Sequence, residues 1–360
     1  MTLWQSLSFP MNCVQKIAVM RASGSENERD GVRYRSLLTA NGMRETRNLI
    51  SLSKTIVKPL ALLALWLLIA PAGSVSAQSP TSNHYFEVPF QLIHNQIVLE
   101  VKIGGKGPFT MLLDTDTDPS AIDLITARDL ELAMGSKAHS VSGGGTEANL
   151  TFLTRIPLVE IGSLSAKNIA AAAIDLKKLS ARLGKPVHGV LGYSFLKDRI
   201  VQIDYPAGKL RFYDANPYPG IQNAPNMVNR IALGFRYDGD VIIDNVFING
   251  RKMRATIDTG SSNTLCLTPE AIAILGLDED VKNARVDTSV GYNGEYEERT
   301  GILKSVRIGR LSLESVQATF WLPGTGHDQK RFQVNIGNDF LKDFVVTFDS
   351  PGKLVILETP

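Results

Sequence analysis

Asp258-Thr259-Gly260-Ser261-Ser262 directly follows the strand-like stretch Met253–Ile257 in the second half of the chain. A degenerate copy of this motif, Asp114-Thr115-Asp116-Thr117-Asp118-Pro119-Ser120, follows the strand-like stretch Phe109–Leu113 in the first half. Each motif places an aspartate at the end of a strand, where a turn is expected to begin. Two such motifs supply two carboxyl groups that are able to face each other.

A second pair of motifs repeats this spacing. Gly189-Val190-Leu191-Gly192 ends 78 residues after Asp114, and Val334-Asn335-Ile336-Gly337 ends 79 residues after Asp258. The paired spacing is far more specific than either motif, because a lone Asp-Thr-Gly-Ser is more often an ordinary turn. The sequence therefore predicts a tandem duplication of one structural half.

With these paired motifs the sequence resembles the aspartic proteases of the pepsin and retropepsin type, over roughly Asn83 to Glu358. In that family each half offers Asp-Thr-Gly-Ser/Thr at the end of a strand and an apolar-apolar-Gly segment that packs beneath it. The resemblance implies an all-β fold of two similar lobes, made of mostly antiparallel strands, with a cleft between the lobes.

The resemblance also implies that Asp114 and Asp258 are the catalytic residues. Two carboxyl groups within hydrogen-bonding distance cannot both ionise readily. They therefore share one proton, and the pair titrates with two separate pKa values. One acts as a base on a bound water, and the other donates its proton to the substrate carbonyl. The sequence leaves open which of the two begins ionised.

Four further residues are expected to support the dyad. The family resemblance implies that Thr115 and Thr259 point away from the cleft and hydrogen-bond across the dyad, which ties the two loops together. Gly260 lets the backbone come close enough to donate an amide to a carboxylate, and Ser261 offers another donor.

The first half departs from the family pattern at Asp116, which stands where glycine is expected. Aspartate tolerates left-handed backbone angles better than most residues, so the turn is expected to survive. A third negative charge beside the dyad would raise the pKa values of the two catalytic carboxyls. Such a charge would move the working pH or abolish activity.

A second register of the first motif is also open. In this alternative Asp116-Thr117-Asp118 is the motif, because Asp116 to Thr126 and Asp258 to Thr268 both span ten positions. The register that begins at Asp114 is preferred, since this residue directly follows the strand.

Two glycine-containing hairpins are candidates for a substrate flap. Ser140–Thr146 contains Gly144, and Ser289–Tyr296 contains Tyr292. Either hairpin is placed to close over a peptide and exclude water. The simpler alternative is that each is only a mobile hairpin tip.

The spacing of apolar residues and turns divides the chain into four parts. These are an upstream extension plus signal peptide at 1–77, a first lobe at 83–216, a linker at 217–226 and a second lobe at 227–360. A short helix is expected after each aspartate motif, at Ile122–Leu132 and at Thr268–Leu277. Each lobe is expected to close with a strand pair, at Ile200–Tyr205 with Lys209–Tyr213 and at Phe344–Phe348 with Leu354–Leu357.

Residues 1–77 have the character of a leader. Met43–Ala77 contains a basic stretch, the apolar segment Leu60–Ala70 and a small-residue cleavage site at Val75-Ser76-Ala77, which predicts a secretory signal and a periplasmic or secreted protein. An uncleaved anchor is the alternative, although the apolar segment is shorter than the about 20 residues of a spanning helix. Residues 1–42 are interpreted as a mis-assigned start, with Met43 as the true first residue.

Composition after the leader argues against several functions. Of the 38 basic and 36 acidic residues, nine and four lie within 1–77, which leaves 29 basic and 32 acidic residues and no support for nucleic-acid binding. Only Cys266 lies beyond the leader, so no intramolecular disulfide is expected and this thiol is expected in the core. The five histidines form no His-Glu-x-x-His pattern, and no metal or cofactor is expected.

The sequence thus favours an exported aspartic endopeptidase that hydrolyses peptide bonds in peptide or protein substrates. A monomer without stable membrane association after signal cleavage is expected, because one chain supplies both carboxyls. The alternative is a catalytically silent peptide-binding module of the same fold, in view of Asp116. A weaker alternative is a homodimer that acts through the intact second lobe.

Overall fold

The computed structural model describes residues 85–138, 143–147, 149–219, 221, 229–328 and 330–360, which all belong to one compact unit. The upstream extension, the signal peptide and most of the linker lie outside the described residues. None of the helices within these described ranges combines the length and apolar character that crossing a membrane requires.

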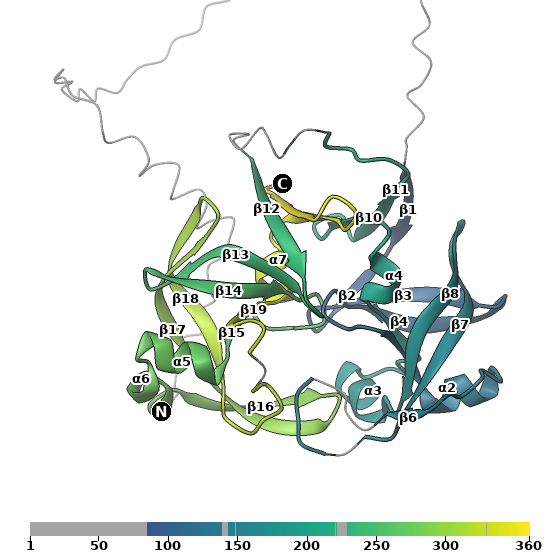
Figure 1. The fold of residues 1–360 in the computed structure, drawn as a ribbon, viewed down its shortest axis with the longest axis horizontal. Helices are drawn as coiled ribbons and strands as arrows, with labels where there is room; N and C mark the ends of the chain where they lie inside the picture. Colours follow the sequence, from purple (N-terminus) through teal and green to yellow (C-terminus); the bar gives the residue numbers. More distant parts are fainter. Residues whose placement is uncertain (1–84, 139–142, 148, 220, 222–228, 329) are drawn as a thin grey trace, which may run out of the picture. The chain divides into compact units, whose positions relative to one another are not determined.

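The first lobe is built on an eight-stranded sheet (Figure 1). Its strands lie in the order β2 (Gln91–Ile93), β3 (Gln96–Ile103), β4 (Lys106–Leu113), β9 (Gly189–Leu191), β5 (Ser120–Asp123), β8 (Leu164–Ile174), β7 (Thr151–Ile161) and β6 (Lys137–Ala138).

The second lobe repeats this order within a thirteen-stranded sheet. The matching strands are β12 (Arg230–Tyr237), β13 (Val241–Ile248), β14 (Arg251–Ile257), β19 (Val334–Ile336), β15 (Leu265–Leu267), β18 (Leu311–Trp321), β17 (Gly294–Ile308) and β16 (Arg285–Gly291). In each lobe two central pairs are parallel, β4 with β9 and β5 with β8 in the first, and β14 with β19 and β15 with β18 in the second. The predicted all-β fold of two similar lobes is confirmed.

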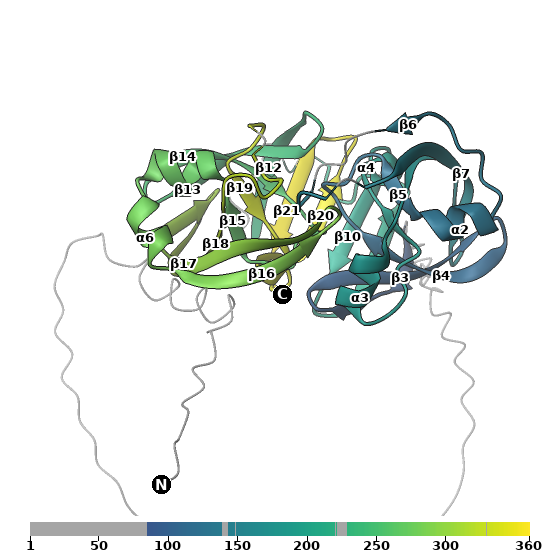
Figure 2. The same cartoon turned by 90° about the horizontal axis from the view of Figure 1, so that it is seen from below.

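The lobes are joined by strands that belong to both. These strands continue the thirteen-stranded sheet beyond β12, in the order β21 (Leu354–Glu358), β20 (Val345–Asp349), β10 (Ile200–Asp204), β11 (Lys209–Tyr213) and β1 (Tyr85–Pro89). At the centre β10 pairs antiparallel with β20, with Gln202 opposite Thr347 (Figure 2). The predicted closing strand pairs are therefore present and lie side by side, whereas the predicted lobe boundaries stay a prediction.

The helices are short and follow local sequence signals. α5 (Pro269–Leu275) begins after Thr268, whose side chain accepts the Ala271 amide, and ends at Gly276, where φ is +64°. The helix expected at Ile122–Leu132 is wrong at both ends, because α2 covers only Leu124–Asp129. Its predicted first residues belong to β5, which is parallel to β8. The other described helices are α3 (Lys177–Leu183), α4 (Tyr193–Leu196), α6 (Asp278–Lys282) and α7 (Asn338–Leu341).

A continuous apolar core fills both lobes beneath the aspartate loops. In β3 the alternating residues Ile97, Leu99, Val101 and Ile103 are all buried, as the period of a strand requires. Because this packing fixes the strands, it also fixes the loops that follow β4 and β14.

Candidate active site

Both aspartates leave their strands at equivalent points. The backbone amide of Asp114 donates to the carbonyl of Leu191 at 3.0 Å, and that of Asp258 donates to the carbonyl of Ile336 at 2.9 Å. Asp114 thus holds in the first lobe the place that Asp258 holds in the second. The alternative register that begins at Asp116 does not reproduce this equivalence.

The glycine motifs lie directly beneath the two loops. A Cβ atom at Gly192 would overlap the carbonyl oxygen of Thr117, and one at Gly337 would overlap that of Asn263. Only glycine allows this close approach of strand and loop. The paired spacing in the sequence therefore has a steric cause.

The threonines after the aspartates link the two lobes. The Thr115 amide donates to Thr259 Oγ1 at 3.0 Å, and the Thr259 amide donates to Thr115 Oγ1 at 3.1 Å. Each hydroxyl then donates across the interface, from Thr115 to the carbonyl of Ile257 at 2.7 Å and from Thr259 to that of Leu113 at 3.0 Å. All four bonds are buried, and they hold the aspartate loops together.

The carboxylate of Asp114 accepts three hydrogen bonds from its own loop. Its Oδ1 accepts the backbone amides of Asp116 at 2.8 Å and Thr117 at 3.1 Å. Its Oδ2 accepts the hydroxyl of Thr117 at 2.6 Å. These contacts fix the orientation of the carboxylate.

Asp258 receives the same backbone contacts but a different third donor. Its Oδ1 accepts the amides of Gly260 at 2.7 Å and Ser261 at 3.1 Å, and its Oδ2 accepts Nδ2 of Asn335 at 2.6 Å. Asn335 was given no role from the sequence. The signal for it is a polar residue inside an apolar strand, at the position where the first lobe has Val190.

Gly260 is needed for space rather than for its backbone angle. A Cβ atom there would overlap the carboxylate of Asp114, and neither Gly260 nor Asp116 has a positive φ. The turn survives with aspartate at position 116, as expected, but without the left-handed backbone angle that was given as the reason.

The two carboxyl groups are in hydrogen-bonding contact with each other, and their residues are 7% and 9% exposed. Burial raises the pKa of both groups, because removal from water disfavours the charged form. The pKa of Asp258 rises to about 8, through burial first and the neighbouring charge of Asp114 second. The two groups therefore share a proton, because like charges at this range cannot both ionise.

Asp116 lies beside the dyad, half-buried, but it does not stand alone. Its Oδ1 accepts the hydroxyl of Thr256 at 2.8 Å, and its carboxyl is hydrogen-bonded to that of Asp240. Burial, with the nearby charges of Asp258 and Asp240, raises the pKa of Asp116 well above its usual range. The surroundings of Asp116 therefore disfavour the third negative charge that the sequence led us to expect.

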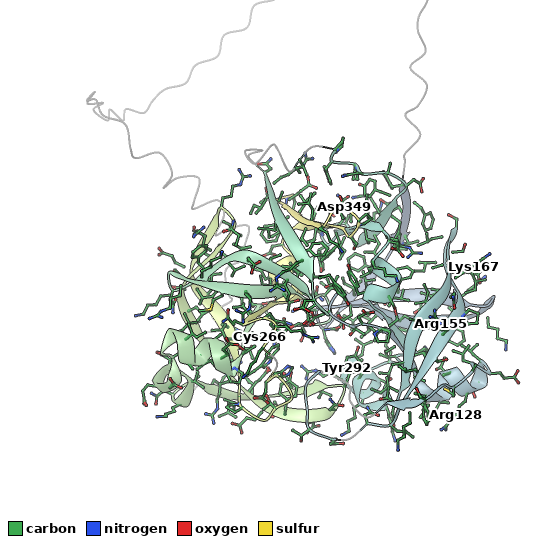
Figure 3. The ribbon with its side chains drawn as sticks, viewed as in Figure 1. Arg128, Arg155, Lys167, Cys266, Tyr292 and Asp349 are labelled. Carbon is green, nitrogen blue, oxygen red and sulfur yellow. The ribbon has the colours of Figure 1, made fainter. Side chains whose placement is uncertain are left out.

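The two predicted flaps meet over the dyad. The tip of the β16–β17 hairpin brings the Tyr292 hydroxyl to 3.1 Å from Oγ1 of Thr117, and the Asn293 amide donates to the carbonyl of Gly144 at 2.9 Å. Tyr292 packs against apolar residues of the first lobe (Figure 3). Residues 140–142, which begin the first predicted flap, lie outside the described ones.

A cavity of about 520 Å³ lies between the flaps and the aspartate loops, a size typical of ligand sites. Both dyad aspartates, Gly144 and Tyr292 line it. Its lining is mixed, and its apolar residues include aliphatic side chains of the first lobe and aromatic rings of the second, namely Ile174, Leu179, Leu183, Tyr296, Trp321, His327 and Phe332.

Other reactive groups are not arranged for separate chemistry. Cys266 is a buried free thiol, and burial raises its pKa. Within the part of the chain that the structure describes, no group of three or more His, Cys, Asp or Glu side chains is placed to hold a metal ion.

Two like lobes that each present one loop aspartate define the class of acid-protease folds. The chain belongs to the aspartyl protease family, because the model of that family, described as aspartyl protease, matches it twice, over residues 99–195 and 245–340.

Among solved structures, a retropepsin-like aspartic protease from Rickettsia conorii is similar at 26% identity, over 36% of this chain and 90% of that chain, with a TM-score of 0.29. Basic 7S globulin from soybean is similar at 12% identity, over 77% of this chain and 95% of that chain, with a TM-score of 0.43. No curated protein matches the sequence.

Proposed function

We propose that the chain is an exported aspartic endopeptidase that hydrolyses peptide bonds with a water activated by Asp114 and Asp258. The observation that carries the proposal is the contact between these two buried carboxyls, each oriented by three hydrogen bonds. Membership of the aspartyl protease family supports a protease-type function. Export is inferred from the leader sequence alone.

The different environments assign the two roles. Asp258 keeps its proton at neutral pH and acts as the acid, because its pKa is raised to about 8. Asp114 is ionised, with its charge stabilised by the hydroxyl of Thr117 and two backbone amides, and acts as the base.

Hydrolysis then proceeds through a tetrahedral intermediate. Asp114 takes a proton from the water as the water oxygen bonds to the scissile carbonyl carbon, while Asp258 gives its proton to the carbonyl oxygen. Asp114 next gives its proton to the amide nitrogen, the carbon–nitrogen bond breaks, and Asp258 regains its proton from the intermediate. Both carboxyls return to their starting protonation states. Because one chain supplies both of them, we propose that the protein acts as a monomer.

The cavity and its cover suit a peptide substrate. The Tyr292 hydroxyl stands at the Asp114 loop, and the flap contact between Asn293 and Gly144 closes the cavity from above. A peptide must displace these contacts on entry, and closure behind it excludes bulk water.

The test is digestion of an unfolded, casein-like protein by the full chain between pH 3 and pH 9, with new amino groups as the readout. We expect cleavage that falls as pH rises through about 8, where Asp258 loses its proton. Asp258→Asn and Asp114→Asn should each remove cleavage. Wild-type-like cleavage by either variant contradicts the assignment of the dyad.

Stability provides the control for these variants. The pKa of Asp258 is raised on folding, so its stabilising contribution is complete below pH 3.8 and is lost as pH rises through about 8. At pH 8 the free energy of unfolding of Asp258→Asn should therefore be at least as large as that of wild type. If wild type binds peptides but cleaves none at any pH, the silent peptide-binding module is the correct alternative.

A further inference from the structure

Among the side chains that reach an aspartate loop from the opposite lobe, Gln96 and Asp240 form an equivalent pair. Gln96 of the first lobe donates from Nε2 to the carbonyl of Gly260 at 2.7 Å. Asp240 holds the matching position in the second lobe, counted from the paired residues of the strands beneath each loop, and its carboxyl contacts that of Asp116. The two inter-lobe contacts are therefore equivalent in place and different in chemistry.

Asp240 is paired with Arg331, whose charge opposes the rise that burial causes in the pKa of Asp240. It is 3% exposed, and Nε of Arg331 lies 2.5 Å from its Oδ2. A Cβ atom at Gly239, where φ is +77°, would overlap the guanidinium of Arg331. The tight turn before β13 thus allows Arg331 to reach Asp240.

The carboxyl of Asp116 is contacted by two groups of the second lobe. The hydroxyl of Thr256, a fully buried residue, donates to its Oδ1 at 2.8 Å, and the second contact of its carboxyl is Asp240. Two carboxyl groups in hydrogen-bonding contact must share a proton. Since Arg331 stabilises the charged form of Asp240, the proton belongs to Asp116.

We propose that Asp116 is a positioning residue. As a neutral acid it donates a hydrogen bond to the carboxylate of Asp240, and this bond ties the first aspartate loop to the second lobe. This inference rests on the proposed peptidase function, which it deepens. In the second loop the inter-lobe contact is made to the backbone carbonyl of Gly260, by Gln96. In the first loop the equivalent contact is made to the side chain of Asp116, by Asp240.

The charges around Asp116 keep its proton in place. The titratable and charged groups that face it or its partner Asp240 are Asp114, Asp258, Asp240, Asp238, Tyr292 and Arg331. Burial and three neighbouring aspartates raise the pKa of Asp116, and Arg331 is the cation paired with Asp240. The dyad therefore gains a link between the lobes without gaining a negative charge.

Two substitutions separate positioning from charge. Asp116→Asn keeps a donor for Asp240 and an acceptor for Thr256, and Asp116→Gly copies the loop of the second lobe and removes the link. We expect the amide to retain kcat within about threefold with the same pH limits, and the glycine to lower kcat by about tenfold or more with little change in KM. Asp238→Asn, which removes an exposed charge beside Asp240, is the matched control and should leave the profile unchanged.

Other outcomes overturn the inference. If both Asp116 variants move the pH optimum downward and raise activity, Asp116 is an anion beside the dyad. If Asp116→Gly is as active as wild type, Asp116 positions nothing.

Thermal unfolding tests the same link without activity. The pKa of Asp116 is raised on folding, so its stabilising contribution is complete below pH 3.8 and is lost as pH rises. Relative to wild type, Asp116→Asn should melt at a similar temperature at pH 4 and several degrees higher at pH 8. If wild type cleaves nothing, the peptidase proposal fails, and this measurement still decides whether Asp116 is a neutral acid. A constant difference at all pH values contradicts it.

Discussion

The loop after β4 and the loop after β14 follow the same path, yet different side chains complete them. In the second lobe Gly260 makes room for the carboxylate of the other aspartate, whereas in the first Asp116 fills the equivalent place and reaches Asp240. The third donor to the carboxylate also differs, because it is a hydroxyl from Thr117 in the first loop and an amide from Asn335 in the second.

This difference separates what a duplicated site must keep from what it is free to change. Backbone amides, the crossed threonines and the glycine beneath each loop are common to both lobes, because they define the position of each carboxyl. The third donor and the inter-lobe contact vary, because several side chains satisfy the same geometry. Variation of this kind gives two identical carboxyls different pKa values, which their roles as acid and base require.

The flaps differ more than the loops. In the second lobe β16 and β17 form a long hairpin of seven and fifteen residues, while β6 of the first lobe has only two residues. Among the described residues, the hairpin of the second lobe contributes Tyr292, whose hydroxyl reaches Thr117 of the first lobe.

The largest expected effect comes from removing what the loops share. Thr115→Val with Thr259→Val deletes four buried hydrogen bonds and leaves several backbone groups unpaired. We expect a loss of about 2–4 kcal/mol in the free energy of unfolding and a more than hundredfold fall in kcat/KM. Urea unfolding and kinetics of the single and double variants measure both, and additive, small losses would show that the threonines do not act as one link.

A smaller effect is expected from making the second lobe resemble the first. Asn335→Val introduces the residue type of Val190 and removes the amide donor to Asp258. We expect kcat to fall by about tenfold to a hundredfold and the pKa of Asp258 to rise further, because its charged form loses a donor. A pH–rate profile checks this, and an unchanged alkaline limit would count against Asn335 as a partner of the dyad.

The sequence predicts the fold and the central pair well, because the repeat carries both. The 78- and 79-residue spacings are consequences of glycines that must touch the loops, so they survive in the sequence. Asn335 was given no role because its motif was read for the glycine alone, and Asp240 was missed because it lies in no motif. Their importance arises from strand pairing and from a turn of the opposite lobe, which become visible only when the chain is folded.

Asp116 shows why the local sequence misleads. Its proximity to the dyad was predicted, but its charge state depends on Asp240 and Thr256, which lie more than 100 residues away. The start of the first predicted helix has a similar explanation. Ile122 and Asp123 have helical spacing in the sequence, but they belong to β5 because they pair with β8.

A modest effect is expected at the flap. Tyr292→Phe keeps the ring packed in the first lobe and removes only the hydroxyl that contacts Thr117. We expect KM to change by about threefold to tenfold with little loss of stability, because one partly exposed hydrogen bond is involved. Steady-state kinetics test this, and wild-type constants would restrict Tyr292 to a packing role.

The smallest effect concerns His327, which stacks on Trp321 with ring centroids 3.8 Å apart. Burial lowers its pKa to about 4, so the neutral form stabilises the fold above pH 6.5 and this contribution is lost as pH falls through about 4. His327→Phe keeps the stacking and should lose about 3 kcal/mol less stability than wild type between pH 7 and pH 4. Unfolding curves at both pH values provide the comparison, and equal losses would contradict a buried neutral imidazole.

The most direct test of the central claim compares Asp114→Asn, Asp258→Asn and the double variant on one peptide substrate. If the two carboxyls from the two lobes form one catalytic unit, each single change should reduce kcat/KM as completely as both together, by about a thousandfold or more. Folding must be shown by an unchanged circular dichroism spectrum. A single variant that keeps wild-type activity, or losses that simply add, would contradict the shared dyad.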